Sequence, residues 1–65
     1  MNFEHFFHKQ SGKRVKVTMT DGEEFEGVLS AYISAADNDP DPESVIIGAT
    51  ELYTDEIKSI EVVNL

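Results

Sequence analysis

The sequence contains no cysteine. Neither a disulfide framework nor a thiolate zinc site can therefore stabilise the fold, although a chain of 65 residues buries only a modest core. Oligomerisation is the remaining common route to stability at this size. No apolar run approaches the ~20 residues that cross a bilayer, and residues 1–5 lack a basic region followed by an apolar stretch. We therefore expect one soluble, cytoplasmic domain spanning residues 1–65, with no membrane association.

Basic residues are scarce. The chain has five Lys and Arg against 13 Asp and Glu, a net charge of −8, whereas nucleic-acid binding depends on Lys and Arg that displace counterions from phosphates. Four of the five lie before residue 17, namely Lys9, Lys13, Arg14 and Lys16. After residue 20 only Lys58 stands against twelve acidic residues. The composition disfavours nucleic-acid binding, and an anion site is expected only at the N-terminal end.

A catalytic constellation is also missing from the sequence pattern. The serines have no histidine at a plausible distance on the same face, and the carboxylates lie on hydrophilic surfaces. His5 and His8 are one helical turn apart, but two imidazoles without a third ligand are typical of a polar helix face rather than a metal site. We expect no enzyme, no cofactor and no metal site.

The segment from 36 to 43 is strongly acidic and contains two prolines. Its carboxylates alternate as in the first half of a calcium loop, at Asp37, Asp39, Asp41 and Glu43. However, Pro42 stands where the sharp-turn glycine belongs, and Gly48 where a bidentate glutamate belongs. A solvated acidic loop is the preferred interpretation, and a calcium-responsive loop is the alternative.

What is present is the pattern of a small β domain behind a short helix. Residues 2–9 are predicted to be helical, with Asn2 as N-cap, with Phe3, Phe6 and Phe7 on one face, and with Ser11-Gly12 ending the helix. Strict alternation predicts a strand over 14–20 and a longer one over 23–35. Further strands are expected over 44–50, 51–54 and 58–63, with a tight helical turn over 54–56.

The connection between the first two strands follows from the faces of the flanking residues. A two-residue Asp21-Gly22 loop would set the inward Met19 opposite the outward Glu24, whereas opposed residues must share a face. A three-residue loop instead pairs Val17 with Phe25 and places Gly22 in the left-handed conformation. Gly27, inside the longer strand, indicates the strong bend that closing a small barrel requires. The predicted fold is mainly β, with an N-terminal helix and a five-stranded, strongly bent antiparallel barrel.

Two motifs resemble the Sm-like family. Val17-x-Met19-x-Asp21-Gly22-x-x-Phe25-x-Gly27-x-Leu29 resembles the first Sm signature, and Tyr53-x-x-x-Ile57-x-Ser59-Ile60 is similar to the closing segment of its bacterial host-factor branch. The resemblance covers about residues 13 to 63 and implies ring assembly through edge strands. The resemblance does not imply RNA binding, because the RNA-binding residues of the family are absent. Thr54 and Asp55 stand where the host-factor branch has a Lys-His pair, and the Arg-Gly signature of the nuclear Sm branch is not present.

The leading hypothesis is therefore a non-enzymatic Sm-like module that acts through protein partners or as a homo-oligomer, and whose acidic surface favours a basic partner. Its candidate contact residues are aromatic: Phe3, Phe7, Tyr32, on the outward face of the long strand, and Tyr53. The alternative is an RNA-binding Sm-like ring that uses Lys9, Lys13, Arg14 and Lys16 at its helix side.

Overall fold

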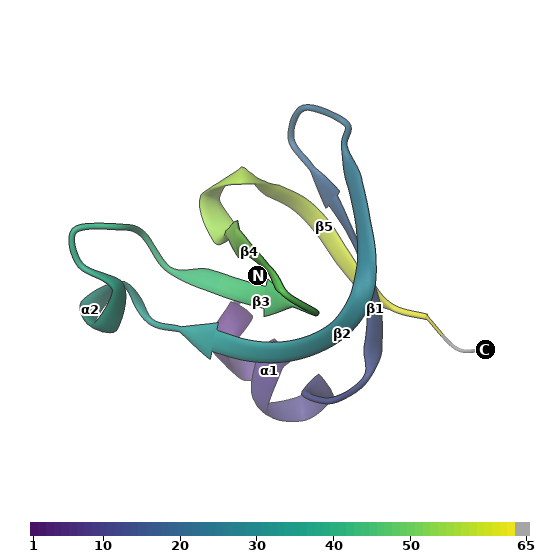
Figure 1. The fold of residues 1–65 in the computed structure, drawn as a ribbon, viewed down its shortest axis with the longest axis horizontal. Helices are drawn as coiled ribbons and strands as arrows, with labels where there is room; N and C mark the ends of the chain where they lie inside the picture. The colour runs from purple at the N-terminus through teal and green to yellow at the C-terminus, as the bar shows by residue number, and fades with distance from the viewer. Residues whose placement is uncertain (64–65) are drawn as a thin grey trace.

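The computed structural model describes residues 1–63 as a helix packed against one five-stranded antiparallel sheet (Figure 1). The strand order is β4-β3-β2-β1-β5. The elements are α1 (Phe3–Gln10), β1 (Arg14–Met19), β2 (Glu24–Ile33), α2 (Ala35–Asn38), β3 (Ser44–Ile47), β4 (Thr50–Tyr53), the 3-10 turn η1 (Thr54–Glu56) and β5 (Ile57–Val62). The predicted mainly β class and the predicted helical turn over 54–56 are confirmed. In the part of the chain that the structure describes, none of the helices is long and apolar enough to span a membrane.

The prediction of a closed barrel is wrong. β4 and β5 form the two edges of the sheet, and each pairs with a single neighbour in the described chain, β3 and β1 respectively. The sheet nevertheless curls strongly, because β2 bends along its length (Figure 1). At the bend, a Cβ added to Gly27 would lie 3.2 Å from Cγ2 of Ile47. Glycine thus allows β3 to approach β2 closely, but the curl stops short of joining the edges.

The hairpin of β1 and β2 has the predicted three-residue connection. Val17 pairs with Phe25 and Val15 with Gly27, and the backbone N–H of Met19 donates to the carbonyl of Glu23 at 2.8 Å. Gly22 has φ +95°, which is the left-handed conformation expected at the end of a type I turn with a bulge. The rule that opposed residues lie on the same face of the sheet was therefore sufficient to predict the register of this hairpin.

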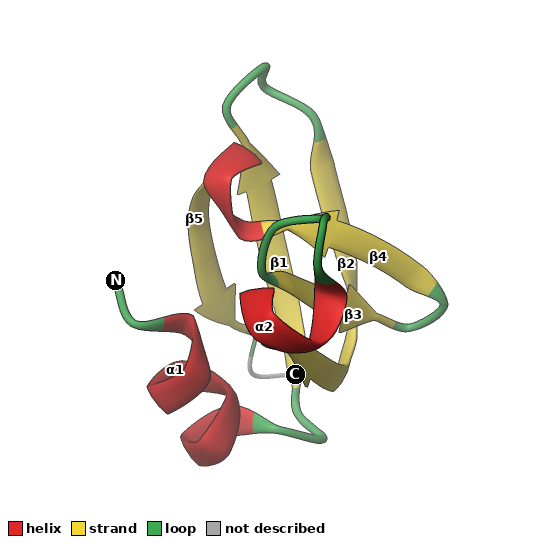
Figure 2. Cartoon of the chain, turned by 90° about the vertical axis from the view of Figure 1, so that its left-hand side faces the viewer, coloured by secondary structure: helices red, strands yellow, loops and turns green. Residues whose placement is uncertain are grey.

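The core lies on the concave side of the sheet. It consists of buried aliphatic and methionine side chains from all five strands, namely Val15, Val17, Met19, Leu29, Val45, Ile47, Leu52 and Ile60. The predicted N-cap is confirmed, since the Asn2 side chain accepts from the backbone N–H of His5 at 3.0 Å. From α1, Phe3, Phe6 and Phe7 pack half-buried against this core. The helix therefore covers part of the core that the open sheet leaves accessible (Figure 2).

The acidic segment is exposed except at Asn38 and Glu43, as predicted for a solvated loop, and it also contains local structure. Its first residues form α2, whose N-cap Ser34 accepts from the backbone N–H of Asp37 at 3.2 Å. Asn38 then donates through Nδ2 to the carbonyl of Pro42 at 2.8 Å and to Glu51 at 3.3 Å. The segment projects from the end of the sheet where β2 ends and β3 begins (Figure 1), and these side-chain hydrogen bonds hold it in place although it lacks apolar residues.

Candidate functional site

Tyr32 faces the core, so the prediction that it points outward is wrong. The pairing of β2 with β3 shifts by one residue between Leu29 and Ala31. β2 has one extra residue at this point, so the residues after it lie on the opposite face of the sheet from the one that simple alternation predicts. Tyr32 therefore lies opposite the buried Val45. Its ring stacks on Phe7 of α1, with the centroids 6.3 Å apart and the planes inclined by 28°. Two of the four candidate contact residues, Phe7 and Tyr32, thus stack on each other within the chain.

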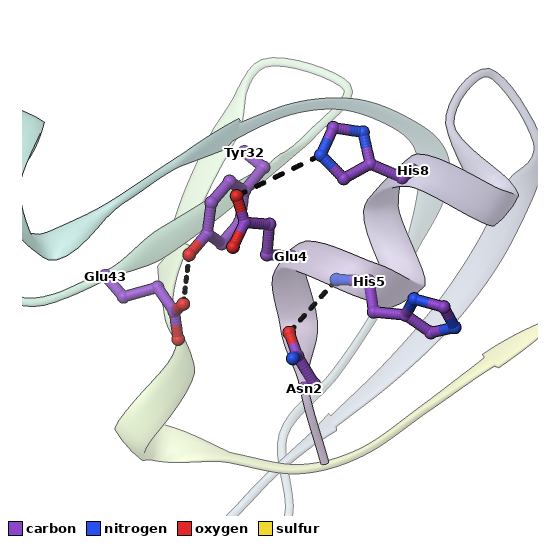
Figure 3. A network of polar contacts seen from close by, with 6 residues as sticks. All are labelled: Asn2, Glu4, His5, His8, Tyr32 and Glu43. Atoms are coloured by element: carbon purple, nitrogen blue, oxygen red, sulfur yellow. Dashed lines mark hydrogen bonds and ion pairs between the residues drawn. The ribbon is translucent and has the colours of Figure 1, made fainter.

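The phenol of Tyr32 belongs to a polar network with the acidic segment (Figure 3). Its hydroxyl donates to Oε2 of Glu43, and Thr54 in η1 donates through Oγ1 to the other carboxylate oxygen at 2.8 Å. The hydrogen bond to the carboxylate, with a smaller contribution from burial, raises the pKa of Tyr32 to about 12. Glu43 therefore joins β2, the end of the acidic segment and η1, which is a structural role rather than that of a free ligand in a loop.

The other candidate ligands do not converge. The imidazole of His8 lies 4.0 Å from the carboxylate of Glu4, both exposed, and His5 points away from that pair (Figure 3). Glu51, from β4, accepts from the hydroxyl of Ser44 at 2.7 Å. Within residues 1–63, no three His, Asp or Glu side chains are grouped so that they could hold a metal ion.

The basic residues of β1 have acidic partners. Arg14 donates through Nε to Glu26 at 2.7 Å, and Nζ of Lys16 lies 3.4 Å from Glu24. These contacts are diagonal, since in the ladder Lys16 is directly opposite Glu26 on β2 and Glu61 on β5. The basic strand is therefore flanked by carboxylates on both sides, which leaves the exposed Lys9 and Lys13 as the cations of the N-terminal end without an ion pair in the described chain.

Tyr53 and Phe3 lie apart. Tyr53 pairs with Ser44 on the face of the sheet opposite to Leu52 and the core. Nearby carboxylates, first Asp41 and then Glu51, raise its pKa. Phe3 packs against the core from α1. Three of the four candidate aromatics, Phe3, Phe7 and Tyr32, thus pack against the core, whereas Tyr53 lies on the other face of the sheet.

Within residues 1–63 the sheet has two unpaired edges, as the expected edge-strand assembly requires, and it also forms a cleft that sequence reasoning did not predict. Each edge strand offers one row of backbone N–H and C=O groups without an acceptor or donor strand in the described chain. The cleft, with a volume of about 260 Å³, is lined by Met19, Thr20, Asp21, Glu23, Phe25, Leu52 and Glu56. We call it the hairpin cleft. Its lining comes from the β1–β2 hairpin, β4 and η1. Because the hairpin is distant in sequence from β4 and η1, no local motif could indicate the cleft.

Comparison of the chain with models of protein families, with curated proteins and with solved structures finds no significant match. The fold therefore rests on the arrangement described above: a helix, a long bent hairpin and three further strands in one open antiparallel sheet. The site features to be explained are the two free edges, the paired basic strand and the acidic hairpin cleft.

Proposed function

We propose that this chain is a non-enzymatic, Sm-like protein-interaction module that assembles through its edge strands. The observation that carries the proposal is the open sheet, whose β4 and β5 edges both remain unpaired in the described chain. Unpaired edges are templates for pairing with another chain, and neither β4 nor β5 contains a proline that would remove a backbone donor. The order of helix, long hairpin, short strand, tight turn and last strand also agrees with the Sm-like resemblance.

Pairing of β4 of one copy with β5 of the next joins two different surfaces. Such heterologous contacts close into a ring when the rotation between copies allows it. The small core gives a second reason for assembly, because a domain of 65 residues without disulfides gains stability from additional backbone pairing. Edge pairing between copies thus supplies the closure that the single sheet lacks.

The test is the molar mass in solution, measured by light scattering over a range of concentrations. We expect a mass above the 7.3 kDa of the single chain that falls on dilution. Lys58 is the residue that the register shift between β1 and β5 leaves without a partner, so proline is tolerated there better than elsewhere in the strand. Lys58→Pro should lower the mass by obstructing the outer edge, whereas Lys58→Ala, which keeps the backbone N–H, should not.

RNA binding is the competing function, and the ion pairs of β1 count against it. Arg14 and Lys16 are engaged by Glu26 and Glu24, so phosphates would have to displace these carboxylates. A labelled single-stranded RNA titrated at low salt gives the most favourable condition for electrostatic binding. We expect no binding there. Salt-dependent binding that is lost in the double variant Lys9→Ala/Lys13→Ala would instead establish the RNA-binding alternative.

A further inference from the structure

The hairpin cleft combines an apolar floor with an acidic rim. Met19 and Leu52 are buried at its base, and Phe25 is half-buried beside them. The carboxylates of Asp21, Glu23 and Glu56 are exposed around it, and within residues 1–63 none of them forms an ion pair. A ligand that fills this cleft must therefore be apolar along its length and positively charged at its end.

The rim carboxylates are held close to one another by the backbone. The N–H of Thr20 donates to the carbonyl of Glu56 at 2.8 Å, which ties the hairpin to η1. Within the turn, Oδ1 of Asp21 accepts from the backbone N–H of Glu23 at 2.9 Å. The acidic rim thus belongs to a defined turn and not to a freely moving loop, and it presents its charge beside the cleft without rearrangement.

The volume of the hairpin cleft and the charge of its rim indicate which kind of ligand fits it. The volume of about 260 Å³ lies below the ~300–1,000 Å³ of sites for drug-sized ligands, so the cleft suits a single side chain. Lysine and arginine both have apolar stems and charged ends. Arginine fits better, because its planar guanidinium stacks on an aromatic ring such as Phe25 and binds carboxylates in a fork. The net charge of −8 also steers a basic partner to this surface and repels a polyanion.

We propose that the hairpin cleft receives an arginine side chain from a basic segment of a partner protein. The stem lies over Met19 and Leu52, the guanidinium stacks on Phe25, and the rim carboxylates bind its N–H groups. This inference rests on the proposed function as a protein-interaction module and names the chemistry of the partner. The β1–β2 turn, which supplies part of the lining, lies at the end of the molecule opposite α1 (Figure 1), so the cleft can be occupied independently of contacts made by the helix.

The test is an NMR titration of the ¹⁵N-labelled chain with the peptide acetyl-Gly-Arg-Gly-amide. The control peptide carries citrulline, which has nearly the same shape and no charge, in place of arginine. We expect the arginine peptide to shift the backbone amide signals of Thr20, Asp21 and Glu23, and the citrulline peptide to leave them in place. Equal shifts from both peptides, or shifts confined to residues outside the cleft, would overturn the proposal. So would equal shifts from guanidinium chloride at the same concentration, because they would indicate an ion site without recognition of the stem.

Matched variants separate the cleft from the general acidity of the chain. Glu56→Gln and Glu4→Gln each remove one negative charge, but Glu4 lies on α1 at the other end of the molecule (Figure 1). Glu56→Gln should weaken arginine binding by up to about fivefold, the range of an exposed ion pair, and Glu4→Gln should not change it. Equal effects of both variants would overturn the proposal.

Light scattering on the same samples distinguishes the two proposals. Arginine binding to a chain that stays at 7.3 kDa would overturn edge assembly and leave the cleft inference standing. An assembled chain whose cleft signals do not respond to the arginine peptide would overturn the cleft inference alone.

Discussion

Replacement of Tyr32 by phenylalanine removes one half-buried hydroxyl near the end of β2 and leaves the ring stacked on Phe7. The hydroxyl donates to Glu43, and a hydrogen bond to a charged acceptor contributes about 1.5–3 kcal/mol. In the variant Glu43 still accepts a hydrogen bond from Thr54, and its side chain is only half-buried. We therefore expect a loss of stability at the lower end of this range, about 1.5 kcal/mol. For a domain of this size that corresponds to a fall in Tm of about 6–12 °C.

Thermal unfolding followed by circular dichroism measures this loss, and Tyr53→Phe is the matched control. The Tyr53 hydroxyl makes no hydrogen bond within residues 1–63, so its removal should leave Tm nearly unchanged. Equal Tm values for wild type and Tyr32→Phe would show that the contact with Glu43 does not stabilise the fold.

The pH dependence of the same variant gives an independent check. Folding raises the pKa of Tyr32 from about 10 to about 12, so the folded state retains a proton that the unfolded state has lost. The stabilisation is therefore fully present below pH 10 and is lost as pH rises from 10 to 12. The difference in unfolding free energy between wild type and Tyr32→Phe should shrink over that interval. A difference that stays constant up to pH 12 would contradict the assigned cause.

The chain allows this pKa to be measured directly, because it has two tyrosines and no tryptophan. In Tyr53→Phe, the ultraviolet titration of the remaining phenol reports Tyr32 alone. We expect an ionisation near pH 12 in the folded protein. An ionisation near pH 10 while circular dichroism still shows the folded sheet would refute the hydrogen bond to Glu43.

Three further substitutions test the local structure. Asn2→Ala removes the side-chain acceptor at the start of α1 and should cost about 1 kcal/mol, whereas unchanged urea unfolding would argue against a docked helix. Gly22→Ala puts a side chain on a residue with φ +95° and should cost about 1–2 kcal/mol, and a more stable variant would contradict the turn. Glu26→Gln breaks the exposed pair with Arg14 and should change stability by less than about 1 kcal/mol, so a larger loss would show a stronger pair.

Local patterns predicted the elements whose cause is local. The alternation of Val15, Val17 and Met19 predicted β1 and its buried face, and parity around Asp21-Gly22 predicted the hairpin register. The N-cap at Asn2 and the helical turn over 54–56 were likewise readable, since each depends on neighbouring residues.

The errors arose where long-range pairing decides the outcome. The register shift after Leu29 turns Tyr32 inward, and alternation within β2 alone cannot reveal it, because the inserted residue is defined only against β3. The failure of β4 and β5 to meet depends on the accumulated curvature of the whole sheet. The hairpin cleft has the same origin, since Leu52 and Glu56 reach the β1–β2 turn only through the folded sheet.

The proposal of edge assembly is tested most directly by amide hydrogen exchange of β4 and β5 at low and high protein concentration. Amides that point away from the sheet have no acceptor strand in the described chain, so they should exchange freely when the protein is dilute. Pairing between copies should protect them at high concentration and leave the exchange of β1 and β2 amides little changed. Exchange of the edge amides that is fast and independent of concentration would contradict assembly through these strands.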